Sequence, residues 1–207
     1  MKAYKLLMDN EIDASKLMDD NGIFYKAAKL FDIELVESIR FKCGKAAYKY
    51  FNYILIDGRI FRNFVKIIGE KNGQIDEMIL LLFLSGCFYL GKGQADRPFK
   101  HLKEALNQET KNEKVNYIRK LWGMGEGVVI LTFLHGSSSK AASTREALMM
   151  DYIGLDTLTN VRQGTFYAGV GSWEKTALDN LAKSYITKLM LDCTGHHVVA
   201  VFKEDIE

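Results

Sequence analysis

The sequence predicts an α+β fold, in which the strands of a small sheet alternate with helices along the chain. Of the 207 residues, 48% are hydrophobic and 12% are aromatic, which is enough apolar surface for a sizeable core. Short β-rich stretches alternate with longer stretches of helical periodicity. The chain contains one proline and no low-complexity or repeated segment, so we expect one domain with a helical extension.

The extension is expected over residues 1–44, and the domain over residues 45–207. Apolar side chains recur at helical spacing in two N-terminal stretches, and Asn21-Gly22 marks the break between them. A further helix from about residue 33 to residue 50 is expected to lead directly into the first strand.

Two strands are expected in the first half of the domain. The first, 53–56, ends at the turn signal Asp57-Gly58. A mixed stretch, 59–80, contains the loop signal Glu70-Lys71-Asn72-Gly73. The second strand, 87–90, is stopped by a glycine-rich segment.

The second half is expected to hold the third strand and most of the helices. Pro98 suits the first turn of a helix, and Gly154 suits a helix end. The expected elements are helices at 97–107, 114–123, 140–153 and 173–191 and a strand at 127–134. The apolar tail, 196–202, is ambiguous between helix and strand.

Charge and cysteine content exclude few classes of protein. The formal net charge of +2, from 28 basic and 26 acidic residues, argues neither for nor against nucleic acid, because a small basic groove fits within a near-neutral total. Cys43, Cys87 and Cys193 show no CxxC spacing, so we expect reduced thiols and a cytoplasmic or nuclear location. The longest apolar run, 78–90, is too short to span a bilayer, so no membrane is expected.

The sharpest local feature is a strand end followed by two glycines and a helix start. Tyr89 ends the strand, and Gly91 and Gly93 permit close backbone approach to a ligand. Arg97 and His101 then lie four residues apart, on one face of the helix. A guanidinium matches phosphate oxygens, and an imidazole exchanges protons near neutral pH. Singly, both would be ordinary helix residues; together they suit a phosphate.

A second feature is Glu146, whose neighbours on its helix face are apolar. A carboxylate in such a stripe must be paired or bind a cation, and Mg²⁺ needs only one or two protein carboxylates. Lys140, Arg145 and Lys175 are the alternative partners. Asn160, just after the helix, can hold a loop by backbone hydrogen bonds, cap a turn or contact a phosphate.

In this order, the residues resemble the GIY-YIG nuclease superfamily, and more narrowly the nuclease domain of animal endonucleases that also carry ankyrin repeats and a LEM domain. Tyr53, in FNYIL, matches the first motif without its glycine and isoleucine; Tyr89-Leu90-Gly91 matches the second. Strings such as FYLGKGQADRPFKHLKEAL and TREALMMDYIGLDTLTN carry the narrower resemblance, which covers about residues 45–170.

The resemblance implies a three-stranded antiparallel sheet of the GIY-YIG type and one set of site residues. These are Tyr53, Tyr89, Lys92, Arg97, His101, Glu146 and Asn160. Glu146 is the implied ligand of a single Mg²⁺ or Mn²⁺, and one of the two tyrosines takes the proton of the attacking water. A tyrosine base needs positive charge nearby, and Lys92 is the candidate. Taken alone, each tyrosine would be a core residue with a tethered hydroxyl.

The implied function is hydrolysis of DNA, branched or distorted, which leaves a 5′-phosphate and a 3′-hydroxyl. Three alternatives stay open at this stage. The chain could be a non-catalytic DNA-binding module that kept the fold, a helical interaction protein that works through residues 1–50, or a nuclease that acts on RNA.

Overall fold

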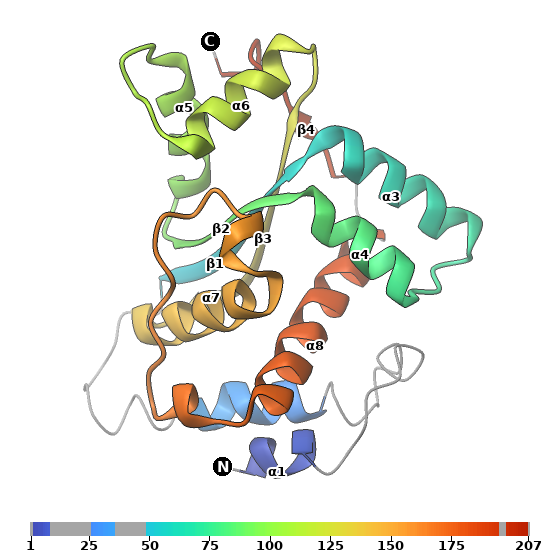
Figure 1. The fold of residues 1–207 in the computed structure, drawn as a ribbon, viewed down its shortest axis with the longest axis vertical. Coiled ribbons are helices and arrows are strands. Elements are labelled where there is room, and N and C mark those ends of the chain that lie inside the picture. The colour runs from blue at the N-terminus through green and yellow to red at the C-terminus, as the bar shows by residue number, and fades with distance from the viewer. Residues whose placement is uncertain (1, 9–25, 36–48, 195–197, 207) are drawn as a thin grey trace.

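The structure is a computed structural model that describes residues 2–8, 26–35, 49–194 and 198–206. Its centre is an antiparallel sheet with the strand order β2-β1-β3-β4 (Figure 1). The strands are β1 (Tyr50–Asp57), β2 (Cys87–Gly93), β3 (Val128–Ser137) and β4 (Ala200–Val201). The α+β class and the three expected strands are confirmed, and the ambiguous C-terminal tail supplies the short fourth strand.

Helices lie on both faces of this sheet. They are α1 (Lys2–Met8), α3 (Gly58–Glu70), α4 (Glu77–Gly86), α5 (Arg97–Leu106), α6 (Glu113–Gly123), α7 (Ser139–Ile153) and α8 (Lys175–Thr194). Residues 26–35 are also helical. The expectation of a mixed stretch at 59–80 is wrong: α3 and α4 occupy it, and the expected loop signal is the turn between them. The prediction that a helix continues to residue 50 is wrong at that end, because β1 begins there.

The central strand β1 is buried on both faces, which explains its nearly continuous apolar sequence. Phe51, Tyr53 and Leu55 belong to a core formed with α5 and α6. Ile54 and Ile56 belong to the opposite core, formed with α3, α4, α7 and α8. Because side chains alternate along a strand, Tyr53 necessarily points toward α5.

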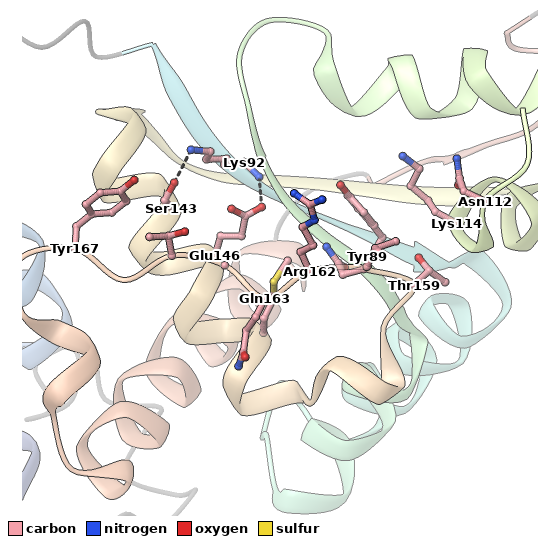
Figure 2. Close-up of a pocket in the computed structure, with 15 residues that line it drawn as sticks. Tyr89, Lys92, Asn112, Lys114, Ser143, Glu146, Thr159, Arg162, Gln163 and Tyr167 are labelled. Carbon is pink, nitrogen blue, oxygen red and sulfur yellow. Dashed lines mark hydrogen bonds between the residues drawn. The ribbon is translucent and has the colours of Figure 1, made fainter.

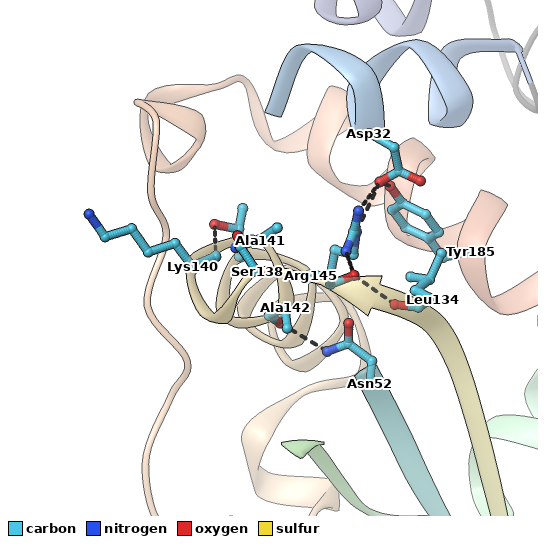
Figure 3. Close-up of polar contacts among 11 residues, drawn as sticks. Asp32, Asn52, Leu134, Ser138, Lys140, Ala141, Ala142, Arg145 and Tyr185 are labelled. Carbon is cyan, nitrogen blue, oxygen red and sulfur yellow. Dashed lines mark hydrogen bonds and ion pairs between the residues drawn. The ribbon is translucent and has the colours of Figure 1, made fainter. Parts of the chain in front are cut away.

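The described N-terminal helices pack against α7 and α8. The rings of Tyr4 and Phe31 contact Trp173, with centroid distances of 5.1 and 5.5 Å. The guanidinium of the buried Arg145 donates to Asp32, and the Tyr185 hydroxyl donates to the same carboxylate oxygen (Figure 3). The division into an extension and a domain at residue 44 stays a prediction, because residues 36–48, like Asn21-Gly22, lie outside the described part.

None of the described helices combines the length and the apolar composition needed to cross a bilayer.

Candidate active site

The site is built along β2, which is an edge strand of the sheet. An edge strand presents backbone groups with no strand to pair them, and here the loop after α7 pairs several. Thr159 donates from its backbone nitrogen and its hydroxyl to the Phe88 carbonyl, at 2.7 and 2.8 Å. The Asn160 amide accepts from the Leu90 nitrogen at 3.1 Å and donates to the Leu90 carbonyl at 2.8 Å. Of the three alternatives for Asn160, its contacts therefore favour loop anchoring.

Further along the same edge, β2 is tied to α7. The backbone nitrogen of Lys92 donates to Glu146 Oε1 at 3.1 Å. The Lys92 ammonium donates to the hydroxyl of Ser139, at the start of α7, and to that of Ser143 (Figure 2 shows the contact with Ser143). The expectation that Lys92 activates Tyr89 is therefore revised: its ammonium is directed to α7, and its backbone orients the Glu146 carboxylate.

Tyr53 lies inside the sheet, across from a glycine of the second motif. Tyr53 pairs with Gly91 in the antiparallel register, and a Cβ at Gly91 would lie 2.6 Å from Tyr53 Cζ. Only glycine leaves room for the ring at this point. The Tyr53 side chain is 1% exposed, and its hydroxyl lies 2.7 Å from His101 Nε2.

Tyr89 is placed differently, because the register of β2 shifts beside it. Leu55 pairs with Tyr89 but Ile56 pairs with Cys87, so Phe88 is an extra residue on β2. Such a bulge re-aims the neighbouring side chains. Tyr89 is only partly buried and lines the pocket, while its ring lies 6.1 Å from the Tyr53 ring and 5.0 Å from the His101 ring.

Burial raises the pKa of both tyrosine hydroxyls, and it raises the pKa of Tyr53 more strongly. A hydrogen bond from Tyr53 counteracts this effect at Tyr89 and lowers its pKa, as does the charge of Arg97; the charge of Glu146 raises it. Burial thus raises the pKa of Tyr89 less than that of Tyr53, and of the two tyrosines Tyr89 is the one that lines the pocket.

His101 is fully buried on α5, although its sequence position suggested a surface residue. Its Nδ1 contacts the Lys114 ammonium of α6 and lies 3.2 Å from Glu104 Oε2. Burial, reinforced by the Lys114 charge, lowers the pKa of His101 to about 4. The imidazole is therefore uncharged at neutral pH.

Arg97 opens α5 at the rim of this cluster. Its side chain is 45% exposed, and its guanidinium lies 3.8 Å from Glu104. A Cβ at Gly93 would lie 2.8 Å from Arg97 Cβ, so the second glycine lets the helix begin close against the strand. The positive charge of Arg97 favours ionised tyrosine and disfavours charged histidine. It therefore acts to lower the pKa values of both tyrosines and of His101.

A pocket of about 550 Å³ is lined by Tyr89, Lys92 and Glu146, among other residues (Figure 2). Its walls come from β2, from the start of α6, from α7 and from the loop that follows Asn160. Three cationic side chains from three different segments line it: Lys92, Lys114 and Arg162. One carboxylate, Glu146, faces them. A pocket with this balance of charge suits a polyanion.

The Glu146 carboxylate has the features of a ligand for one hard cation. One oxygen accepts the Lys92 N–H, which leaves the other for a metal, and burial raises its pKa although Lys92 partly offsets this. Within the described ranges, no group of three or more acidic, histidine or cysteine side chains could hold an ion. Glu146 is the carboxylate that lines the pocket, and Mg²⁺ accepts a single protein carboxylate when water and phosphate oxygens complete its shell.

The expected residues thus lie in two adjoining groups. Tyr53, Arg97 and His101 surround the inner side of Tyr89, and the other expected residues line the pocket on its outer side. Sequence reasoning missed Lys114, Glu104 and Arg162. One weak indication of a special role for Lys114 is its place in the first turn of a helix, where a positive charge interacts unfavourably with the helix dipole.

Comparison with known proteins places the chain in a family. The model described as the LEM-3-like GIY-YIG domain matches residues 50–207. The chain is 30% identical to the ankyrin repeat and LEM domain-containing protein 1 homolog of Caenorhabditis elegans over 152 residues, 70% of this chain and 20% of that protein. Its identity to the Mus musculus ankyrin repeat and LEM domain-containing protein 1 is 30% over 146 residues, 68% of this chain and 27% of that protein.

The Homo sapiens protein of the same name is 37% identical over 102 residues, 45% of this chain and 17% of that protein. The chain therefore spans about a quarter or less of the length of the curated relatives it matches. No solved structure matches it. Because the family match covers far more than half of the chain, the chain belongs to the LEM-3-like GIY-YIG domains, a family of nucleases.

Proposed function

We propose that this chain is a metal-dependent DNA endonuclease that acts on branched or distorted DNA and leaves a 5′-phosphate and a 3′-hydroxyl. The observation that carries the proposal is that Tyr89 and Glu146 line the same pocket, together with the cationic side chains of Lys92, Lys114 and Arg162. This arrangement offers a proton acceptor, a cation ligand and phosphate-binding charge within one cavity.

In the proposed reaction, a water oxygen bonds to phosphorus in line with the 3′-oxygen, and the bond between phosphorus and that oxygen breaks. The Tyr89 phenolate takes the proton of the water, and the released 3′-oxygen takes a proton from solvent. Arg97 and Arg162 stabilise the charge on the phosphoryl oxygens. Glu146 would hold the divalent cation, which would supply Lewis acidity, and its charge would offset the unfavourable effect of that carboxylate on the ionisation of Tyr89.

The position of Tyr89 supports the proposed preference for distorted DNA. Tyr89 is partly buried, so the phosphate must enter a pocket bordered by the loop from Asn160 to Tyr167. A strand near a nick, flap or junction can bend to place a phosphate there more readily than a strand held in a regular duplex. Deforming a duplex costs free energy that an already flexible site does not require.

The experiment compares cleavage of linear, nicked, flap and four-way-junction DNA in Mg²⁺, Mn²⁺ and EDTA. We expect cleavage of the three discontinuous or branched substrates at higher rates than the linear duplex, abolished by EDTA. The products should be ligatable, which requires a 5′-phosphate and a 3′-hydroxyl. Tight binding to junctions with no cleavage in either metal would instead support the non-catalytic module, and faster cleavage of matched RNA would reassign the substrate.

A further inference from the structure

A chain of polar contacts runs inward from the pocket to α6. The Tyr89 ring lies 6.1 Å from the ring of Tyr53, and the Tyr53 hydroxyl lies 2.7 Å from His101 Nε2. On the other side of the ring, His101 Nδ1 contacts the Lys114 ammonium. His101 is 0% exposed and Tyr53 is 1% exposed, so solvent does not supply alternative partners along the chain.

The direction of these hydrogen bonds is set at Lys114. An ammonium group has three donors and no acceptor, so Nδ1 must accept from it. An uncharged imidazole has one protonated nitrogen, so the proton is on Nε2 and Nε2 donates to the Tyr53 oxygen. The Tyr53 hydroxyl then has its own proton free to donate to the Tyr89 oxygen. Every bond in the chain points toward Tyr89.

We infer that Lys114 is a positioning residue of the nuclease site, which holds His101 in its Nε2–H tautomer and thereby directs the Tyr53 proton to Tyr89. This inference rests on the proposed function, because the benefit is to a Tyr89 that acts as a phenolate. A phenolate gains from each hydrogen bond that it accepts.

The Glu104 carboxylate competes with Lys114 for His101 Nδ1, and this competition is why the site needs the lysine. Glu104 Oε2 lies 3.2 Å from His101 Nδ1 and 3.2 Å from Lys114 Nζ. Without the lysine, a protonated Nδ1 would donate to this carboxylate. Nε2 would then accept from Tyr53, whose proton would no longer reach Tyr89, and the whole chain would reverse.

The fold holds Lys114 in place from two directions. Asn112 caps α6 by accepting from the backbone nitrogen of Val115 at 2.9 Å, which fixes the first turn that carries Lys114. Later in α6, the Arg119 guanidinium donates to backbone carbonyls at the end of α5 and in the connecting loop, including those of Ala105 and Thr110 at 2.9 Å. Lys114 itself is 8% exposed.

The first test uses the unaltered chain without DNA. Nitrogen-15 NMR of the histidine side chains, with the His101 signals assigned through His101→Gln, reports which ring nitrogen carries the proton. We expect a protonated Nε2 and an unprotonated Nδ1 near neutral pH. A protonated Nδ1 would overturn the inference whether or not the chain cleaves DNA, and absent cleavage would refute the proposed function without touching this result.

The second test uses variants on a nicked DNA substrate. In Lys114→Met the proton should move to Nδ1, and kcat should fall by about tenfold to a hundredfold with little change in KM. Lys114→Arg keeps a donor and should retain most of the turnover. Lys120→Met removes the same charge from an exposed position of α6 and serves as the matched control.

A second substitution that restores a hydrogen-bond donor to His101 Nδ1 distinguishes control of the tautomer from a general loss of positive charge or of folding stability. In Lys114→Met/Glu104→Gln the new amide can donate to Nδ1 at the place where the carboxylate accepted. We expect the Nε2–H tautomer to return and kcat to recover severalfold over Lys114→Met. If Lys114→Met keeps the wild-type tautomer, or if the double variant shows the tautomer restored with no recovery of kcat, the inference is wrong.

Discussion

At the scale of single residues, the two tyrosines of the site differ in exposure and in hydrogen-bond partners. Tyr53 is enclosed between Gly91 and His101, whereas Tyr89 reaches the pocket that Glu146 lines. A proton acceptor has to contact its water directly, or through one intervening water. The buried hydroxyl of Tyr53 is suited to supporting Tyr89, and the accessible hydroxyl is suited to the reaction itself.

We therefore expect Tyr89→Phe to lower the single-turnover cleavage rate by about a hundredfold or more, because it removes the proton acceptor. The dissociation constant for uncleaved DNA in Ca²⁺ should change little, since the ring remains. Tyr53→Phe serves as the comparison and should lower the rate by a smaller factor. An unchanged rate in Tyr89→Phe together with a lost rate in Tyr53→Phe would reverse the two roles.

His101 makes a separate prediction about stability. Its pKa is 6.5 ordinarily and about 4 in the folded chain, because burial opposes its charge. Between these pH values the unfolded chain binds a proton that the folded chain does not, so the free energy of unfolding must decrease as pH falls from 6.5 to 4. Urea titrations at several pH values should show a smaller decrease in His101→Gln. Equal pH dependence in both proteins would contradict the assignment of a neutral imidazole.

At this scale the sequence predicts which residues belong to the site better than it predicts which side chains contact one another. Helix spacing predicted that Arg97 and His101 share a face, because it is a local property, whereas the grouping of Tyr53, Glu146 and Asn160 with them was implied only by the resemblance to the GIY-YIG superfamily. The direction of the Lys92 ammonium and the contact of Lys114 with His101 depend on how α5, α6 and α7 pack. Residues 13 positions apart, such as His101 and Lys114, share no local pattern.

At the scale of elements, the second motif is a contact between two strands. The Tyr53 ring occupies the space above Gly91, so a methyl group at Gly91 collides with ring atoms that are nearly fully buried. The same ring carries the hydroxyl that contacts His101. Any shift of the ring therefore affects stability and the hydrogen-bond chain together.

Gly91→Ala should lower the free energy of unfolding by about 1–3 kcal/mol, as expected for overpacking, and should also slow cleavage in the folded fraction. Gly69→Ala is the matched control, because a Cβ there meets nothing within 4 Å in α3. It should leave stability equal or slightly higher, since alanine favours helix. Denaturant unfolding measures the stability of both variants. Equal stability of Gly91→Ala and wild type would show that the Tyr53 ring can move to make room for the methyl group.

Element types were predictable where periodicity was strong, and less so where apolar residues ran together. The helices over α5, α6, α7 and α8 and the strands β1, β2 and β3 were expected within a few residues of their observed bounds. The apolar run from Met78 to Leu90 spans nearly all of α4 and the first half of β2, and periodicity alone does not divide it. Strand β4 has two residues and exists only through pairing with β3.

At the scale of the whole molecule, the described N-terminal helix at 26–35 is joined to the nuclease core by a buried ion pair. Arg145 is 4% exposed, directly precedes Glu146 on α7, and is paired with Asp32. Such a pairing across more than a hundred residues could not be read from local sequence, and Arg145 had been expected only as a partner for Glu146. The described helix at 26–35 thus helps to hold α7, the helix that carries Glu146.

Asp32→Ala should destabilise the chain by about 3 kcal/mol, because it leaves a buried guanidinium without its carboxylate partner. Asp192→Ala is the control, since its pair with Lys188 is half-exposed, and exposed pairs contribute about 0.5 kcal/mol. Thermal or urea unfolding measures the difference. Equal effects of the two substitutions would mean that the N-terminal helix does not depend on this ion pair.

The central claim is that one carboxylate and one tyrosine on opposite walls of a single pocket make this chain a DNA nuclease. Single-turnover cleavage of nicked DNA in Mg²⁺ by wild type and Glu146→Gln tests it most directly, with Glu109→Gln as an exposed control and thermal unfolding recorded for each. We predict that Glu146→Gln lowers the rate by about a hundredfold or more while unfolding at the same temperature or higher, because it removes a buried charge and the cation ligand. Cleavage by folded Glu146→Gln at the wild-type rate would contradict the account.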